Sequence, residues 1–348
     1  MASLIEEVYD IRFERSLNPE RGSPPRVRFA DRFELEEPIG SGGMSVVFAA
    51  HDIKLGRAVA LKLLDAVQAD AEQCIEHEAR CIARISHPNV VTVFDTGRCE
   101  HGVFLTMELV AGFSALRWLR HPTSWQMAVE IYVMAGQGLL AAHQAGIVHG
   151  DFKPANVLIE GQGRYAKVAD FGIARLLEER ARATEPTTEP VAGTLGYTAP
   201  ERMRGGPPDP LADQFAFCVA LWERLAGRRP FDGDTGEAVY AAMLTRDLRD
   251  RSLLPRGVPR RLHAILRKGL AFDPSERFAS MQELLRELGE LPEQLADRRR
   301  RLCGGVLGLG LLVAIPSVLA VGVAIGEERR GLADLQLASP AARRSSAS

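Results

Sequence analysis

The feature that most constrains the fold is a run of residues with catalytic and metal-binding side chains near the middle of the chain, directly before an apolar segment. His149-Gly-Asp-Phe-Lys-Pro-Ala-Asn156 puts a carboxylate, a cation and an amide within a few positions, directly before the apolar Val157-Leu-Ile. Fourteen residues after Asn156, the strand-like Ala166-Lys-Val-Ala leads into Asp170-Phe-Gly. The pattern predicts a catalytic carboxylate, a phosphate-neutralising cation and oxygen ligands for a hard cation, all converging on one site.

Two earlier segments supply groups that suit the same chemistry. Ile39-Gly-Ser-Gly-Gly-Met-Ser-Val-Val47 places glycines between two strand-like stretches, where missing side chains let backbone amides approach phosphates. Alone, such a hairpin is equally well a simple turn. Fifteen residues after Val47, the strand-like Ala58-Val-Ala-Leu-Lys62 ends with an ammonium that could reach phosphate oxygens. Lys62 needs a fixed partner, for which Glu78 is the first candidate and Glu76 the alternative.

In their order and spacing these segments resemble the signature set of the protein kinase family, over residues 33 to about 290. Further segments fit the resemblance: Met107-Glu-Leu-Val110 is similar to the gatekeeper and hinge, and Ala199-Pro-Glu201 to the end of the substrate-binding loop. Asp213 resembles the aspartate of the central C-lobe helix, and Arg277 the late arginine that pairs with the glutamate of Ala-Pro-Glu. The form of the catalytic loop and Gly193-Thr-Leu-Gly-Tyr197 resemble Ser/Thr kinases rather than tyrosine kinases.

The resemblance implies a role for each matching residue. Asp151 would orient or accept the proton of the substrate hydroxyl, Lys153 would stabilise the transferring phosphoryl group, and Asn156 and Asp170 would hold Mg²⁺, with Mn²⁺ as the alternative. Lys62, paired with Glu78, would position the phosphates of ATP. The nucleotide-binding residues implied by the resemblance are Ile39, Gly40, Ser41, Gly42, Gly43, Met44, Ser45, Val47, Ala60, Lys62, Met107, Glu108, Val110 and Leu158.

The chain departs from the family pattern in the catalytic loop. The usual His-Arg-Asp is His149-Gly-Asp151 here, and the missing arginine is the one that typically clamps a phosphorylated residue of the activation loop. We therefore expect activity to depend little on phosphorylation of Thr184, Thr187 or Thr188, which fall in the polar stretch 178–192 that reads as a mobile loop. Cys218, at a position usually glycine, is expected to be a small buried hydrophobe rather than a redox sensor.

The expected fold class is α+β: a two-lobed protein kinase fold, with a β-rich N-lobe and an α-rich C-lobe, plus a single transmembrane helix. The predicted divisions are an N-terminal extension at 1–31, a kinase domain at 32–290, a basic juxtamembrane segment at 291–301, the transmembrane helix at 302–325 and a short extracytoplasmic tail at 326–348. The extension is expected to pack loosely, with a docking or dimerisation helix as the alternative.

The transmembrane prediction rests on residues 302–325, which carry no charge. As a helix, these 24 residues would be about 36 Å long, enough for a hydrocarbon core of about 30 Å. A buried core helix is the weaker alternative, since such helices rarely run this long without a polar face. Arg298 to Arg301 precede the span and favour a cytoplasmic kinase domain on a single-pass cell (inner) membrane protein.

Composition limits the partners. A formal net charge of -2 gives no electrostatic footprint for nucleic acid. The expected partners are ATP and proteins with Ser or Thr acceptors, and a homodimer through the small residues of the span stays open. Two rival functions also remain: a pseudokinase that acts as a membrane-tethered binding module, and a small-molecule phosphotransferase, whose family shares the His-Gly-Asp motif.

Overall fold

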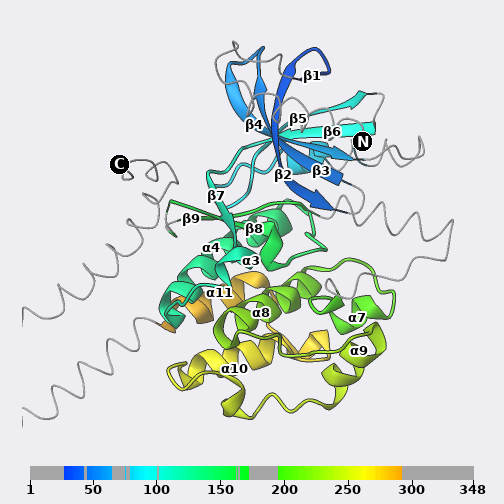
Figure 1. Ribbon diagram of the computed structural model, residues 1–348. Coiled ribbons are helices and arrows are strands. Elements are labelled where there is room, and N and C mark those ends of the chain that lie inside the picture. Colours follow the sequence, from blue (N-terminus) through cyan, green and yellow to red (C-terminus); the bar gives the residue numbers. More distant parts are fainter. Residues whose placement is uncertain are drawn as a thin grey trace, which may run out of the picture. The chain divides into compact units, whose positions relative to one another are not determined.

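The computed structural model describes residues 27–42, 45–64, 75, 79–99, 102–161, 163, 165–171 and 195–291. The chain divides into two units, residues 1–292 and 293–348, and all the described residues lie in the first. Within it, the larger sheet forms an N-lobe, and the helices gather with a smaller sheet in a C-lobe (Figure 1). The two-lobed α+β fold expected from the sequence is therefore confirmed.

The N-lobe is one antiparallel sheet with the strand order β1-β2-β3-β4-β6-β5. Residues 27–31, assigned by sequence to the extension, belong to this lobe, because β1 pairs with β2 and Phe29 packs edge-on against Phe104. The bounds are β1 Arg28–Phe29, β2 Phe33–Gly42, β3 Ser45–Asp52, β4 Arg57–Leu64, β5 Val93–Cys99 and β6 Gly102–Met107.

The register of the sheet sorts the strand residues onto two faces. Val47 is paired with Lys62 and Ala60 with Met107, and since successive side chains alternate, all four lie on one face. The intervening residues, among them Phe48, Leu61 and Phe104, form a separate apolar cluster on the opposite face. Lys62 and three of the predicted nucleotide-binding residues therefore share the face that continues into the main core.

The C-lobe is built around two long helices. A second antiparallel sheet, with the order β7-β8-β9, lies against α4 and carries the candidate catalytic segments at its ends. The bounds are β7 Gly112–Ser114, α3 Ala115–Trp118, α4 Trp125–Gln144, η1 Pro154–Asn156, β8 Val157–Glu160, β9 Tyr165–Val168, α7 Pro200–Met203, α8 Pro210–Ala226, α9 Gly236–Thr245, η2 Arg251–Leu253, α10 Arg260–Gly269, η3 Pro274–Glu276 and α11 Met281–Gly289.

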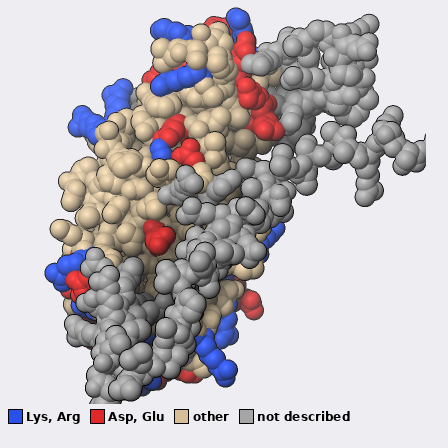
Figure 2. Space-filling view, turned by 90° about the vertical axis from the view of Figure 1, so that its left-hand side faces the viewer, with Lys and Arg blue, Asp and Glu red and all other residues tan. Residues whose placement is uncertain are grey.

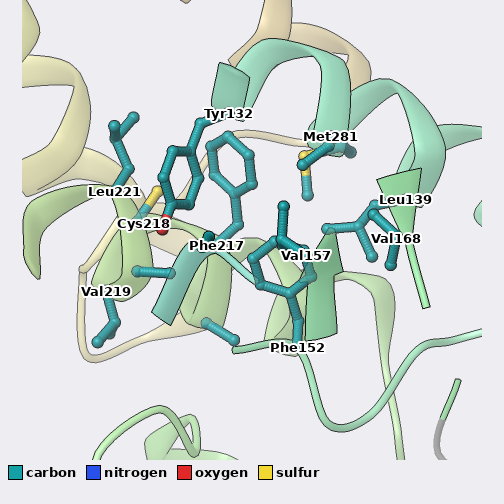
Figure 3. Packing of buried hydrophobic residues seen from close by; sticks show 14 of the residues in the cluster. Tyr132, Leu139, Phe152, Val157, Val168, Phe217, Cys218, Val219, Leu221 and Met281 are labelled. Carbon is teal, nitrogen blue, oxygen red and sulfur yellow. The ribbon is translucent and has the colours of Figure 1, made fainter. Parts of the chain in front are cut away.

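The core of the C-lobe forms where α4, α8 and α11 meet the small sheet (Figure 3). Tyr132 of α4 meets Phe217 of α8 edge-on, with ring centroids 5.8 Å apart, and Phe152 of the catalytic loop lies 5.9 Å from Phe217. Cys218 is fully buried beside them, and burial raises the pKa of its thiol to about 12. The expectation of a small buried hydrophobe at this position is confirmed.

The described surface mixes charges of both signs. On the face shown in Figure 2, basic and acidic side chains both occur on the N-lobe at the top and on the C-lobe at the bottom. Within the described ranges, no helix is both long enough and apolar enough to span a bilayer. The predicted span, residues 302–325, lies outside those ranges.

Candidate active site

The catalytic loop is held by a buried carboxylate of α8. The backbone N–H groups of His149 and Gly150 donate to Asp213 Oδ2 and Oδ1, each at 2.8 Å, and His143 Nε2 lies 2.8 Å from Oδ2. Asp213 is 2% exposed, and hydrogen bonds inside a protein are stronger than in water because the surroundings screen less. The position predicted for Asp213 in the central helix is confirmed, and its carboxylate fixes where the loop begins.

The ring of His149 connects the catalytic loop to the segment after β9. Its Nε2 lies 3.0 Å from the carbonyl oxygen of Ala169, and its Nδ1 accepts the N–H of Asp151 at 3.2 Å. Burial lowers the pKa of His149, which keeps the imidazole neutral. A neutral ring that accepts at Nδ1 must donate from Nε2, so both contacts are hydrogen bonds. The ring also packs against Phe171, with the ring centroids 4.7 Å apart and the rings tilted by 35°.

Asp151, Lys153 and Asn156 come together on the catalytic loop. Asp151 Oδ2 lies 2.7 Å from Lys153 Nζ, and Asn156 Nδ2 donates to the backbone oxygen of Asp151 at 2.8 Å and to its Oδ2 at 3.3 Å. Asp151 Oδ1 has no hydrogen bond from any described residue. The loop thus presents a carboxylate that is oriented by an ammonium group and an amide.

Lys62 of β4 and Asp170, which follows β9, form an ion pair in the site. Lys62 Nζ lies 2.9 Å from Asp170 Oδ1, although the two residues are 108 positions apart. Asp170 has a φ of 56°, a conformation that asparagine and aspartate tolerate better than most residues. Among the residues described, Asp170 is the partner of Lys62. The predicted partner Glu78 and its alternative Glu76 both lie outside the described residues.

The donor set suits a hard divalent cation. Asn156 and Asp170 are held close together, because the N–H of Ala169 donates to the backbone oxygen of Asn156 at 2.9 Å. Among the described residues, no group of three or more His, Cys, Asp or Glu side chains is placed to hold a metal. Mg²⁺ is commonly bound by one or two oxygen ligands of the protein together with substrate phosphates, so an amide and a carboxylate fit such an ion.

The predicted adenine pocket lies on the face of the sheet that carries Lys62. Val47, Ala60 and Met107 are neighbours in the register, and Leu158 on β8 packs against the same core. A cavity of about 30 Å³ is lined by Met107 together with Lys62, Ile82 and Phe171. Gly43 and Met44 lie outside the described residues, as do Gly172, Thr184, Thr187, Thr188 and Thr194.

The hinge predicted at 108–110 is an irregular segment between β6 and β7. The Glu108 side chain forms an ion pair with Lys167 of β9. The backbone N–H of Glu108 donates to the carbonyl oxygen of Thr92 at 2.9 Å. Val110 is half-buried against the main core. The segment is therefore anchored by its first residue to β9 and to the residue that precedes β5.

Sequence reasoning missed one positioning residue, Asn89. Its Nδ2 donates to the carbonyl oxygen of Ala166 at 2.8 Å, and its own carbonyl oxygen accepts the N–H of Val168 at 2.9 Å. A β-carbon on Gly138 of α4 would lie only 2.3 Å from the Asn89 oxygen, so α4 can approach this closely only with glycine there. The sequence signal that could have indicated this residue is a polar side chain between His-Pro and Val-Val. The structure shows that this side chain is buried.

The backbone conformation at position 150 favours glycine. Its φ is +73°, in the left-handed region, where a side chain costs about 1–2 kcal/mol. A β-carbon at this position would meet no atom within 4 Å, so the backbone conformation alone restricts the residue. Glycine at position 150 replaces the arginine that the family pattern would place there. It is also the residue type that best fits the backbone conformation of the catalytic loop.

Gly150→Ala is therefore expected to lower the free energy of unfolding by about 1 kcal/mol. Gly257→Ala is the matched control, because a β-carbon there also meets no neighbouring atom and the glycine has no positive φ. Urea unfolding followed by tryptophan fluorescence would compare the two. Equal stability of the two variants would show that the left-handed conformation of Gly150 carries no cost.

The segment Ala199-Pro-Glu201, predicted to end the substrate-binding loop, is held by an ion pair whose arginine is fully buried. Arg277 Nη1 and Nη2 lie 2.7 and 2.8 Å from Glu201 Oε1 and Oε2, a parallel two-bond contact. The guanidinium also donates to the carbonyl oxygens of Ala271 and Leu211, each at 2.9 Å. The pairing of Arg277 with the glutamate of Ala-Pro-Glu, predicted from the sequence, is confirmed.

Comparison with known proteins agrees with this geometry. Residues 33–288 match the family model described as the protein kinase domain. The serine/threonine-protein kinase PknL of Mycobacterium bovis is 35% identical over 270 residues, covering 76% of this chain and 67% of the relative. PknB of Mycobacterium leprae is 36% identical over 309 residues, covering 83% of this chain and 49% of the relative.

Solved structures give the same result. The crystal structure of the PknI kinase domain of Mycobacterium tuberculosis superimposes with a TM-score of 0.58 and 25% identity, covering 76% of this chain and 96% of that chain. Rad53 in complex with AMP-PNP, at 22% identity and a TM-score of 0.59, shares the fold. Together with the matched family model, these relatives show that the chain belongs to the protein kinase domain family and is a serine/threonine protein kinase.

Proposed function

We propose that the chain transfers the γ-phosphoryl group of ATP to serine and threonine hydroxyls with Mg²⁺, through the residues gathered around Asp151, while held at a membrane by residues 302–325. The observation that carries the catalytic part is the position of Asp151, Lys153 and Asn156 on one loop, which is bonded through the backbone of Asn156 to Ala169, the neighbour of Asp170 in the Lys62–Asp170 pair. When bound, the Mg²⁺ ion would neutralise charge on the phosphates.

Each side chain has a task that its contacts support. The Oδ1 atom of Asp151 would accept the hydrogen bond of the substrate hydroxyl and orient its lone pair for attack, while Oδ2 stays with Lys153 and Asn156. Lys153 would place its ammonium beside the developing phosphoryl charge. Lys62 would contact phosphate oxygens, and Asn156 and Asp170 would supply the protein oxygens for the metal. The reaction needs positioning and charge stabilisation rather than a covalent intermediate on the protein.

The arrangement at Gly150 supports a kinase that works without a phosphorylated activation loop. Glycine has no guanidinium with which to hold a phosphate of the activation loop. The catalytic loop itself is already held by Asp213 and His149. Simultaneous exchange of Thr184, Thr187 and Thr188 for alanine should therefore lower the rate of generic substrate phosphorylation by less than about tenfold, which is about 1.4 kcal/mol. A larger loss in a steady-state kinase assay would contradict the proposal.

The membrane part of the proposal rests on the uncharged stretch 302–325 and on Arg298 to Arg301 before it. The full chain should stay in the membrane fraction after carbonate washing, and a variant that lacks 302–325 should be released. A reporter fused after residue 348 should report the extracytoplasmic side. Recovery of the full chain in the wash would contradict the anchor, and a cytoplasmic reporter signal would contradict the orientation.

A further inference from the structure

A groove of about 540 Å³ lies in the C-lobe between the end of α9, the loop that follows it and α10. None of its lining residues belongs to the candidate active site. Its floor is apolar and includes the buried side chains of Phe231, Met243 and Leu270. Its rim carries four cations, Arg246, Arg249, Arg267 and Lys268, against the two carboxylates of Asp247 and Glu276. The groove thus combines an apolar floor with an excess of positive charge.

The cations of the rim are only partly compensated. Arg249 donates to both carboxylate oxygens of Asp247, at 2.9 and 3.1 Å, and Lys268 lies 3.6 Å from Glu283. Arg246 and Arg267 have no ion-pair partner among the residues that the structure describes. The hydrogen bond from Arg249 lowers the pKa of Asp247, and the charge of Arg267 adds to the effect. Two guanidinium groups therefore remain for an anionic ligand.

The groove is tied to the substrate-binding loop by direct contacts. Arg277, which holds Glu201, also donates to the carbonyl oxygens of Ala271 and Phe272 in the groove wall, at 2.9 and 3.4 Å. Arg204, directly after α7, stacks over the ring of Phe272 at 5.1 Å. A ligand in the groove would therefore lie against residues bonded to the end of the substrate loop.

We propose that this groove docks an acidic segment of a protein substrate, one in which carboxylates flank an apolar side chain. This inference rests on the proposed kinase function. The guanidinium fork matches carboxylate geometry and is weakly hydrated, so Arg246 and Arg267 suit acidic side chains, while the apolar floor takes the side chain between them. Docking here raises the local concentration of the phosphoacceptor at the active site.

The direct test uses a fluorescein-labelled peptide in which glutamates flank a phenylalanine, titrated with the full chain in detergent. Saturable binding is expected, and the double variant Arg246→Glu and Arg267→Glu should weaken it at least tenfold. Arg256→Glu with Arg260→Glu is the control: it makes the same charge change at exposed residues outside the groove, and it should bind like the wild type. No saturable binding, or equal loss in both double variants, would overturn the proposal.

Two further experiments complete the test. The first asks whether the groove prefers carboxylates or phosphate groups, and the second separates docking from kinase activity. A peptide with phosphothreonine in place of the glutamates that binds at least tenfold more tightly would replace the acidic segment with a phosphorylated one, and so overturn the proposal. For kinetics, an acceptor peptide is compared with the same peptide carrying the acidic segment on a flexible linker. The segment should lower KM at least tenfold in the wild type only, whereas failure to phosphorylate either peptide would count against the kinase function itself.

Discussion

Asp151→Asn will lower kcat for protein phosphorylation by about 10²- to 10⁴-fold, the usual contribution of a positioned proton acceptor. Asparagine keeps the shape of the side chain but has no carboxylate oxygen to offer the substrate hydroxyl. Stability should change little, by about 0.5 kcal/mol or less, because the side chain is partly exposed and its ion pair with Lys153 lies near solvent. Steady-state kinetics and thermal unfolding on the same preparations would measure both quantities.

The control is Asp234→Asn, which makes the same chemical change at an exposed residue of the C-lobe. Its kcat should match that of the wild type. A kcat for Asp151→Asn within about threefold of the wild type would show that another group handles the hydroxyl proton. Lost activity accompanied by a large fall in melting temperature would instead assign the aspartate to the fold.

Arg277→Ala will lower the free energy of unfolding by about 3 kcal/mol, the lower end of the range for breaking a buried ion pair, because the Glu201 side chain left behind is 24% exposed. The Arg277 side chain is fully buried, and its loss leaves the Glu201 carboxylate and the carbonyl oxygens of Ala271 and Leu211 without their donor. Arg277→Lys should recover only part of this loss, because an ammonium cannot form the parallel bonds of a guanidinium.

Urea unfolding is a suitable measurement, because all three tryptophans, Trp118, Trp125 and Trp222, lie in the C-lobe that the pair stabilises. Arg256→Ala, at an exposed residue, is the control and should stay within about 0.5 kcal/mol of the wild type. A loss below about 1 kcal/mol for Arg277→Ala would mean that the surrounding structure relaxes to solvate Glu201.

The parts of the site that the sequence predicts well are those close together in the chain. Asp151, Lys153 and Asn156 lie within one short segment, so their meeting needs only a local loop between α4 and β8. The face shared by Lys62, Ala60 and Val47 follows from strand alternation plus a hairpin. The Arg277–Glu201 pair is distant in sequence and was predicted through the family resemblance, not through spacing.

The parts that the sequence could not supply depend on tertiary contacts. Nothing local shows that Lys62 pairs with Asp170, since the two come from different lobes. Asn89 and the ring of His149 each act through backbone groups of the β9 segment, which have no sequence signature of their own. The missing arginine at Gly150 is visible in the sequence, but the positive φ that favours glycine there is visible only in the structure.

The most direct test of the central claim is the transfer of labelled phosphate from γ-labelled ATP by the purified wild-type chain with Mg²⁺, with the acceptor identified by mass spectrometry. The account predicts that phosphoserine or phosphothreonine forms on protein and that chelation of the metal prevents its formation. ATP binding without transfer would indicate a pseudokinase, and transfer only to small-molecule alcohols would indicate a small-molecule phosphotransferase. Either result would contradict the account.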